Sequence, residues 1–196
     1  MALKKILLIV SGGIAAYKAP EIARHLIKKS FSVHCILTKA GSKFITELCL
    51  QTISGNKVFT DLFSLTDEFE MGHIKLARDM DAILVAPATA NIMASVANGL
   101  AMDLATTTLL ATEKPIIMAP AMNPKMWLNP ATKKNTEILR SRGITILGPA
   151  IGETACGESG EGRMLDPSKI ALLTQSHITK DQPLSGLRAI VTSGPT

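Results

Sequence analysis

Aromatic residues and long apolar runs are scarce in this sequence. Aromatics make up only 4% of the 196 residues, so a core has to be built from aliphatic side chains. No apolar run reaches the roughly 18 residues that a membrane-spanning helix needs, so no membrane partner is expected. The net charge is +5, but no block of lysines and arginines interleaved with aromatics occurs. This disfavours nucleic acid as a partner and suits anionic small molecules.

Cysteine is also scarce, and the three cysteines lie far apart. They form neither a CxxC pair nor a disulfide framework, which favours a reducing, cytoplasmic environment. Cys35 falls in an apolar strand pattern and Cys49 in a helical one, so both are predicted to be buried, inert thiols. No spacing of His, Asp and Glu is typical of a metal site, and no metal is expected.

Short apolar runs alternate with helical patterns along the chain. The runs predict strands over 5–10, 32–37, 82–86, 115–119 and 144–147, and the patterns between them predict helices over 15–29, 42–53, 92–97, 104–111 and 131–142. The first run is interpreted as a strand and not as a signal peptide, because a charged helical pattern follows it. Such alternation predicts an α/β fold of the Rossmann or flavodoxin-like type, with a parallel sheet between two helical layers.

Small, hydroxyl and amide residues follow four of these strands, where ligands bind in parallel sheets. The segments are Ser11–Ala16, Thr38–Ser42, Pro87–Asn91 and Pro120–Pro124. The turn with Gly12 and Gly13 can present backbone N–H groups to a phosphate. Because the third glycine of a dinucleotide fingerprint is missing and no acidic residue follows the second strand, a mononucleotide is favoured over a dinucleotide. A simple tight turn is the alternative.

Two further side chains are candidates for chemistry. His73 precedes the third predicted strand, where it would act as a base or substrate contact, or else as a surface or capping histidine. Asn123 lies between two prolines, and its amide could hold a carboxylate without bringing a charge, or simply form the turn before Pro124. Met122, Met126 and Trp127 would line an apolar wall or belong to the core.

The segment 152–164 is rich in glycine and carries Cys156 and Arg163. No apolar periodicity runs through it, so it is predicted to be an exposed loop and not part of the core. A thiol placed there could donate a proton or attack a substrate held beneath it.

These motifs together resemble the flavin-containing cysteine decarboxylases, and among them the phosphopantothenoylcysteine decarboxylases. The resemblance covers about residues 4–175. It rests on Ser11–Lys18, His73, Ala86–Asn91, Pro120–Asn123, and Ala155–Glu158 with Gly162–Met164. The tail, from about 191 to 196, is similar to the opening of a phosphopantothenate–cysteine ligase domain, which many bacteria fuse behind the decarboxylase.

The resemblance implies FMN as the cofactor and decarboxylation of phosphopantothenoylcysteine to phosphopantetheine in coenzyme A biosynthesis. It implies FMN contacts from Gly12, Gly13, Ile14, Thr38, Ser42, Thr89, Ala90, Asn91 and Ala121. Substrate contacts would come from Asn123, with Met122, Ala155 and Arg163. His73 would be the catalytic histidine, and Cys156 the proton donor that acts after CO2 has left. The route would pass through a thioaldehyde and an enethiol of the substrate.

By the same resemblance the chain would self-associate as a trimer, and full-length bacterial fusions would build dodecamers. A decarboxylase domain is expected over 1–176, a linker over 177–186 and the truncated start of the ligase domain over 187–196. Open alternatives are a decarboxylase of cysteine-ended peptides, a flavin prenyltransferase, a non-catalytic FMN-binding regulatory subunit and an electron-carrying flavodoxin.

Overall fold

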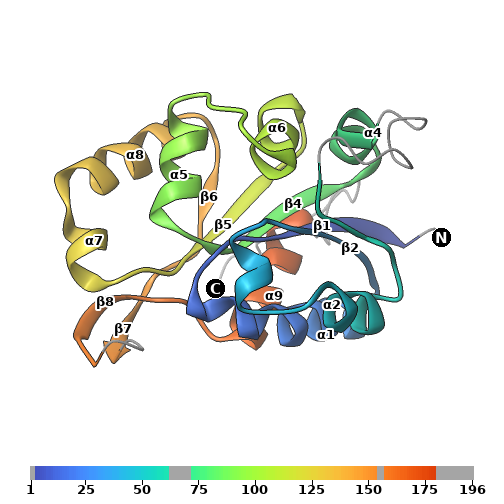
Figure 1. The fold of residues 1–196 in the computed structure, drawn as a ribbon, viewed down its shortest axis with the longest axis horizontal. Coiled ribbons are helices and arrows are strands. Elements are labelled where there is room, and N and C mark those ends of the chain that lie inside the picture. Colours follow the sequence, from blue (N-terminus) through green and yellow to red (C-terminus); the bar gives the residue numbers. More distant parts are fainter. Residues whose placement is uncertain (1–2, 62–71, 154–156, 180–196) are drawn as a thin grey trace, which may run out of the picture.

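A parallel sheet runs through the middle of the molecule, and helices cover both of its faces (Figure 1). The computed structural model describes residues 3–61, 72–153 and 157–179, with residues 72–75 described by their backbone alone. Within these residues the sheet has six strands in the order β3-β2-β1-β4-β5-β6. The strands are β1 (Lys4–Val10), β2 (Phe31–Leu37), β3 (Val58–Phe59), β4 (Ala82–Ala88), β5 (Ile116–Pro120) and β6 (Thr145–Ile146).

Each face of the sheet has its own helical layer. The helices α1 (Ala19–Lys28), α2 (Glu47–Ser54) and α9 (Pro167–Ile178) cover one face, and α4 (Gly72–Asp79), α5 (Ala90–Ala97), α6 (Leu104–Ala111) and α8 (Pro130–Ser141) cover the other (Figure 1). This is the three-layer α/β fold that the alternating pattern predicts, and a strand order of 3-2-1-4-5-6 is typical of doubly wound sheets.

The central strand β1 shows how the sheet supports two cores. Leu8 and Val10 pack into the core beneath α1 and α9, whereas Leu7 and Ile9 pack into the core beneath α5 and α6, and all four are fully buried. Burying each such side chain contributes about 1.5–3 kcal/mol to the free energy of unfolding. Because both faces are covered, β1 has a continuous apolar run and no alternation with polar residues.

Two predicted helices begin later than expected. The helix predicted over 15–29 is a 3-10 turn, Ile14–Lys18, followed by α1, because Pro20 has no N–H to donate to the Ala16 carbonyl. The helix predicted over 42–53 is a 3-10 turn, Gly41–Lys43, followed by α2. Thr46 has an extended backbone and caps α2 by accepting a hydrogen bond from the Cys49 N–H at 3.2 Å.

The prediction of a loop over 152–164 is wrong for most of the described part. Strands β7 (Ala150–Glu153) and β8 (Ser159–Arg163) pair antiparallel, and Met164 belongs to the core with 2% of its surface exposed. The ribbon has no apolar alternation, because its backbone pairing does not depend on burying one face. Residues 154–156, which include Ala155 and Cys156, lie outside the described residues.

Besides β7 and β8, four elements have no counterpart in the sequence prediction. These are β3, which has only two residues, α4, α7 (Pro124–Leu128) and α9. Because α9 extends to Ile178, His177 lies in a helix and not in the predicted linker. Residues 187–196, the predicted start of a second domain, lie outside the described residues. In the part of the chain that the structure describes, no helix has the length and apolarity needed to cross a membrane.

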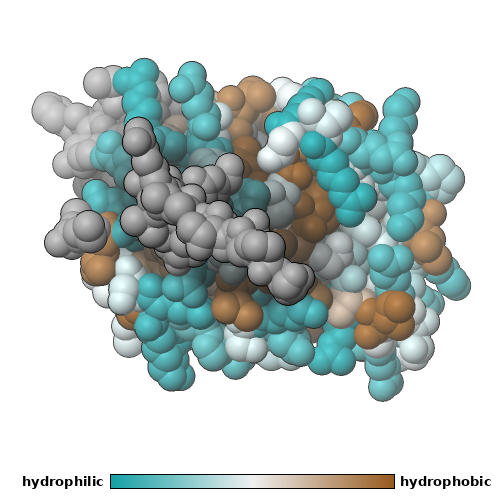
Figure 2. Space-filling model, turned by 180° about the vertical axis from the view of Figure 1, so that it is seen from behind, coloured by the Kyte–Doolittle hydropathy of each residue, from teal (hydrophilic) through white to brown (hydrophobic). Residues whose placement is uncertain are grey.

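Large apolar side chains that remain exposed include Leu48, Met102, Leu110 and Ile151. Seen from behind, the surface shows apolar residues in separate patches among hydrophilic ones (Figure 2).

Candidate functional site

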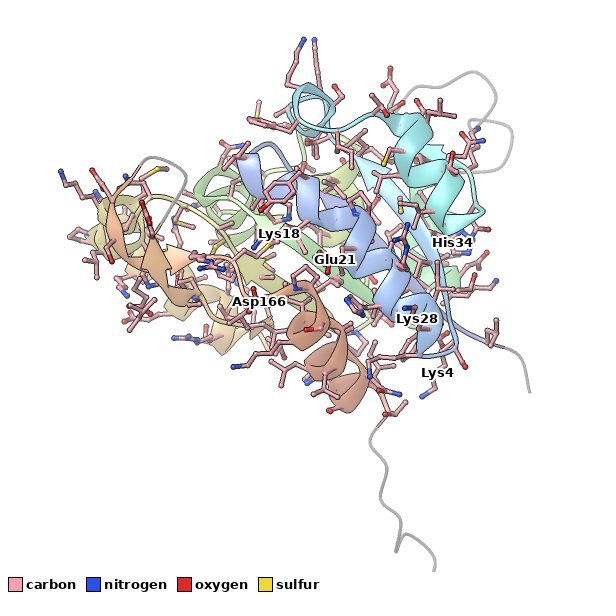
Figure 3. All side chains as sticks on the ribbon, turned by 90° about the horizontal axis from the view of Figure 1, so that it is seen from below. Lys4, Lys18, Glu21, Lys28, His34 and Asp166 are labelled. Atoms are coloured by element: carbon pink, nitrogen blue, oxygen red, sulfur yellow. The ribbon has the colours of Figure 1, made fainter. Side chains whose placement is uncertain are left out.

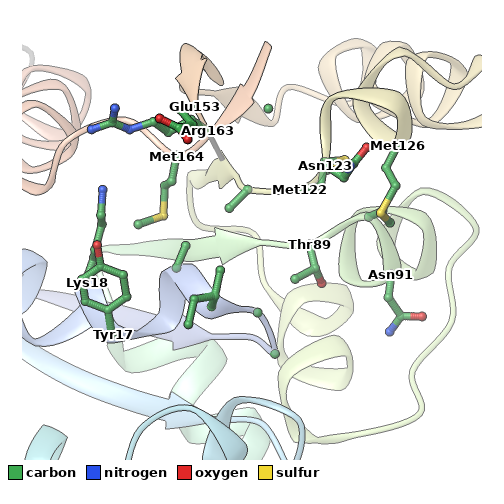
Figure 4. Close-up of a pocket in the computed structure, with 17 residues that line it drawn as sticks. Tyr17, Lys18, Thr89, Asn91, Met122, Asn123, Met126, Glu153, Arg163 and Met164 are labelled. Atoms are coloured by element: carbon green, nitrogen blue, oxygen red, sulfur yellow. The ribbon is translucent and has the colours of Figure 1, made fainter. Parts of the chain in front are cut away.

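A pocket of about 890 Å³ opens at the carboxyl ends of β1, β4 and β5 (Figure 4). The strand order reverses between β1 and β4, and ligands of doubly wound sheets bind at this point. The volume lies near the upper end of the roughly 300–1,000 Å³ that small-molecule sites span. Its lining comes from the turn after β1, the start of α5, the turn after β5 and the β7–β8 ribbon: Gly12–Ala15, Tyr17, Lys18, Thr89–Asn91, Ala121–Asn123, Met126, Glu153 and Gly162–Met164.

Ser11 joins the ends of β1 and β4 beneath this pocket. Its hydroxyl is buried and donates to the Pro87 carbonyl oxygen at 2.7 Å, and it lies 3.3 Å from the Thr89 hydroxyl. The Thr89 oxygen in turn caps α5 by accepting from the Ile92 N–H at 3.5 Å. The first turn of α5, with Ala90 and Asn91, is thereby held facing the Gly12–Gly13 turn.

Gly12 is required by packing. A Cβ at this position would come within 2.3 Å of the Ala40 Cβ and 2.9 Å of the Ala40 carbonyl carbon, distances that atoms in contact do not reach. At Gly13 the added Cβ would meet only the Thr89 methyl group, at the ordinary contact distance of 3.5 Å. The backbone of the β1 turn therefore lies against the loop that follows β2.

Thr38 and Ser42 lie on that neighbouring loop and do not line the described pocket. The Thr38 hydroxyl is buried, donates to the Val10 carbonyl oxygen at 3.2 Å and accepts from the Gly41 N–H at 3.0 Å. The Ser42 hydroxyl donates to the Lys39 carbonyl oxygen at 2.9 Å. In this structure both hydroxyls shape the loop that supports Gly12, and any contact they make with a cofactor remains a prediction.

Positive charge and apolar surface meet in the pocket. Lys18, from the turn before α1, and Arg163, from β8, reach it from the same side, whereas Thr89 and Asn91 lie across from them (Figure 4). The side chain of Arg163 is 47% exposed, and its guanidinium lies 3.7 Å from an Asp166 oxygen. A site of this kind suits a ligand with an apolar body and an anionic end.

Hydrogen bonds hold both the oxygen and the nitrogen of the Asn123 side-chain amide in place. Its Oδ1 accepts from the Lys125 N–H at 2.8 Å and so caps α7, while its Nδ2 donates to Glu158 Oε2 at 2.7 Å. Asn123 therefore forms the turn before Pro124, as one interpretation expects, whereas its binding of a substrate carboxylate stays a prediction. The carboxylate bound to Nδ2 here belongs to the chain itself.

The β7–β8 ribbon packs closely on the turn after β5. The Met122 N–H donates to the Gly162 carbonyl oxygen at 3.0 Å, and a Cβ at Gly162 would lie 2.4 Å from the Met122 carbonyl oxygen. Lys133 of α8 lies 3.9 Å from Glu161 and also stacks over the Trp127 ring at 4.6 Å. Gly162 therefore permits close backbone approach, which is a different role from the loop freedom that the sequence suggested.

The side chains of the two predicted catalytic residues, His73 and Cys156, are not among those that the structure describes. The backbone of His73 lies in α4, which packs on α6, and no described residue of α4 lines the pocket. Cys156 lies outside the described residues. Cys35 is buried as predicted, and burial raises the pKa of its thiol to about 12, so it stays protonated at neutral pH. Cys49 is only partly buried.

No functional role is predicted from the sequence for Lys18, Tyr17 or Glu158. Lys18 lies four positions after Ile14, about one helical turn, and this spacing could have placed it on the same face of the turn. Glu158 reaches Asn123 across 35 positions of the chain, a proximity that no local pattern encodes.

Residues 1–179 match the Flavoprotein family. The chain is 45% identical over its full length to the coenzyme A biosynthesis bifunctional protein CoaBC of Vibrio vulnificus strain YJ016, of which it covers 49%. The chain thus spans about half the length of this curated relative.

Two solved structures are similar to the chain. One is a cysteine-to-serine variant of PPC decarboxylase complexed with pantothenoylaminoethenethiol, with a TM-score of 0.78, 31% identity, and coverage of 89% of this chain and 98% of that one. The other is the FMN binding protein AtHal3, with a TM-score of 0.76, 32% identity, and coverage of 91% and 98%.

Proposed function

Because the chain belongs to the Flavoprotein family, we propose that it binds FMN in the pocket and decarboxylates 4'-phosphopantothenoylcysteine to 4'-phosphopantetheine, a step of coenzyme A biosynthesis. The observation that supports this best is the Asn123 amide, which lines the pocket and binds a carboxylate in the structure. The similarity to a decarboxylase complexed with a pantothenoyl compound supports the substrate class.

The residues of the pocket fit FMN. Gly12 and Gly13 bring backbone N–H groups to its edge, and the first turn of α5 supplies those of Ala90 and Asn91, which suits a phosphate and polar ring atoms. Ile14, Met122 and Met126 provide an apolar wall for a flat ring system. We propose that Gly12, Gly13, Ile14, Thr89, Ala90, Asn91 and Ala121 hold the cofactor, with Thr38 and Ser42 supporting the phosphate side.

FMN, when bound, supplies a two-electron oxidation of the substrate's CH2–SH group to a thioaldehyde and later returns the electrons, so no NAD(P)H is consumed. Asn123 would orient the substrate carboxylate so that the electron pair of the breaking bond to CO2 passes into the thioaldehyde C=S group. His73 would assist the proton movements of the oxidation and decarboxylation steps. Cys156 would protonate the resulting enethiol as it is reduced, which completes the saturated thiol product.

Replacement of Cys156 by serine is expected to separate these steps. In a single turnover, CO2 release should stay within about tenfold of the wild-type rate, and the flavin should remain reduced. Formation of the saturated product should fall at least about a hundredfold, since a serine hydroxyl is a far weaker acid than a thiol. Mass spectrometry of the reaction should show 4'-phosphopantothenoylaminoethenethiol, the phosphorylated form of the compound bound to the similar cysteine-to-serine variant. Full conversion to the saturated thiol by this variant would refute the role of Cys156.

Lys18 and Arg163 are suited to the phosphorylated end of the substrate, because they bring positive charge to one side of the pocket. Replacing Lys18 with methionine should raise KM for phosphopantothenoylcysteine about tenfold or more and leave KM for unphosphorylated pantothenoylcysteine unchanged. Flavin absorbance should show that FMN is retained.

Lys28 offers a matched control for this substitution. Lys18 directly precedes α1 and Lys28 ends it (Figure 3), so Lys28→Met removes the same charge at the far end of the helix without touching the pocket. An equal rise of KM for both substrates in the Lys18 variant would contradict a phosphate contact.

The main competing function is decarboxylation of cysteine-ended peptides. The similarity of this whole chain to about half of a coenzyme A biosynthesis protein favours the small substrate over a peptide. Measuring CO2 release from phosphopantothenoylcysteine and from a cysteine-ended peptide separates the two, and a preference for the peptide would overturn the proposed substrate. Assembly into trimers and a cytoplasmic location remain part of the same proposal.

A further inference from the structure

Asn123 lines the pocket, and the amide nitrogen proposed to bind the substrate's carboxylate already holds a carboxylate of the chain itself. Glu158 Oε2 accepts from Asn123 Nδ2 at 2.7 Å. Rotating the amide to direct its nitrogen elsewhere would break the hydrogen bond that its Oδ1 accepts from the Lys125 N–H at 2.8 Å. An N–H···O⁻ bond at this distance is short and charge-assisted, so it is among the stronger hydrogen bonds.

Two carboxylates on one amide nitrogen would repel each other. If the substrate's carboxylate also accepted from Asn123 Nδ2, two negatively charged oxygens would lie about 5 Å apart within a partly buried site. We propose that Glu158 is a resident carboxylate that the substrate displaces from Asn123, and that it returns when CO2 has left. This inference rests on the proposed function, since it requires a substrate that carries a carboxylate.

The surroundings of Glu158 allow this exchange. Its other oxygen, Oε1, lies 3.7 Å from Lys125 Nζ, so a displaced Glu158 still has a cation beside it. Gly157, which precedes it, has a φ of +77° and open space where a Cβ would stand. Because the product has no carboxylate, it cannot compete for Asn123, and Glu158 thus selects against retention of the product.

Two ligands that differ only in the carboxylate test this exchange. N-(4'-phosphopantothenoyl)alanine keeps the carboxylate but has no thiol to oxidise, and 4'-phosphopantothenoyl ethylamide lacks the carboxylate. Their affinities for the FMN-loaded protein are measured by isothermal titration calorimetry in wild type, Glu158→Gln and Glu161→Gln. The last variant is a matched control, because Glu161 lies on the same ribbon and pairs with Lys133.

Glu158→Gln should bind the alanine conjugate about three- to tenfold more tightly than wild type, because a neutral amide competes less well for Asn123. Affinity for the ethylamide should stay unchanged, and Glu161→Gln should change neither ligand's affinity. Unchanged or weaker binding of the alanine conjugate to Glu158→Gln would overturn the exchange while leaving the proposed function intact. Failure of wild type to bind either ligand would overturn the proposed function and the exchange with it.

Discussion

Replacing Gly12 with alanine is expected to lower the affinity for FMN about a hundredfold, because the turn that lines the pocket would have to move. The added Cβ would stand 2.3 Å from the Ala40 Cβ and 2.9 Å from the Ala40 carbonyl carbon. The β1 turn and the loop after β2 are in close contact, so neither can move without the other. The Thr38 hydroxyl binds the Val10 carbonyl oxygen, and the same oxygen lies only 2.6 Å from where a Cβ of residue 41 would stand, a position that is free because residue 41 is glycine. Fluorescence titration of the apoprotein with FMN measures the loss.

Gly13→Ala is the matched control for this prediction. The neighbouring glycine also lines the pocket, but its added Cβ would meet only the Thr89 methyl group at 3.5 Å. This variant should keep its affinity for FMN within about tenfold, because an ordinary contact requires no displacement of backbone. Equal losses in both variants would mean that backbone packing at Gly12 does not determine cofactor binding. Circular dichroism would show that both variants remain folded.

Asn123→Asp is expected to reduce kcat/KM for phosphopantothenoylcysteine about a thousandfold or more. The substitution removes the only N–H donor of this side chain and places a third negative charge beside Glu158 and the substrate's carboxylate. The fold should survive, because an aspartate oxygen can still cap α7 by accepting from the Lys125 N–H. Steady-state CO2 release, with FMN content checked by absorbance, measures the effect.

Asn129→Asp is a matched control, because it makes the same substitution at a similar helix cap that lies outside the described pocket lining. Asn129 also precedes a proline and also caps a helix, since its Oδ1 accepts from the Ala131 N–H at 2.9 Å at the start of α8. It does not line the described pocket, so kcat/KM should stay within about twofold, and stability should hold or rise slightly because aspartate is a good helix cap. A retained activity in Asn123→Asp would remove Asn123 from the site.

The sequence predicts the sheet well because buried parallel strands have continuous apolar runs. Ile6–Val10 is such a run, and the small residues after β1, β4 and β5 line the pocket. Helix starts are less certain, since one proline at position 20 and one threonine cap at position 46 decide them. The β7–β8 ribbon escapes prediction because its pairing is made by backbone groups.

The candidate site shows the same division. Gly12, Gly13, Ile14, Thr89–Asn91 and Ala121–Asn123 can be located from the strand ends, and each lines the pocket. Long-range contacts cannot be read in this way. Between Asn123 and Glu158 in the sequence lie α7, α8, β6 and β7, and only the fold brings the two side chains together.

The central claim is that this chain, with FMN bound, removes CO2 from phosphopantothenoylcysteine without net oxidation. The most direct test incubates the FMN-loaded protein with carboxyl-labelled phosphopantothenoylcysteine, without NAD(P)H, and measures labelled CO2 together with the mass of the product. The account predicts one CO2 for each 4'-phosphopantetheine formed over many turnovers. No CO2 release from a flavin-loaded protein, or a product that stays unsaturated in the wild type, would contradict it.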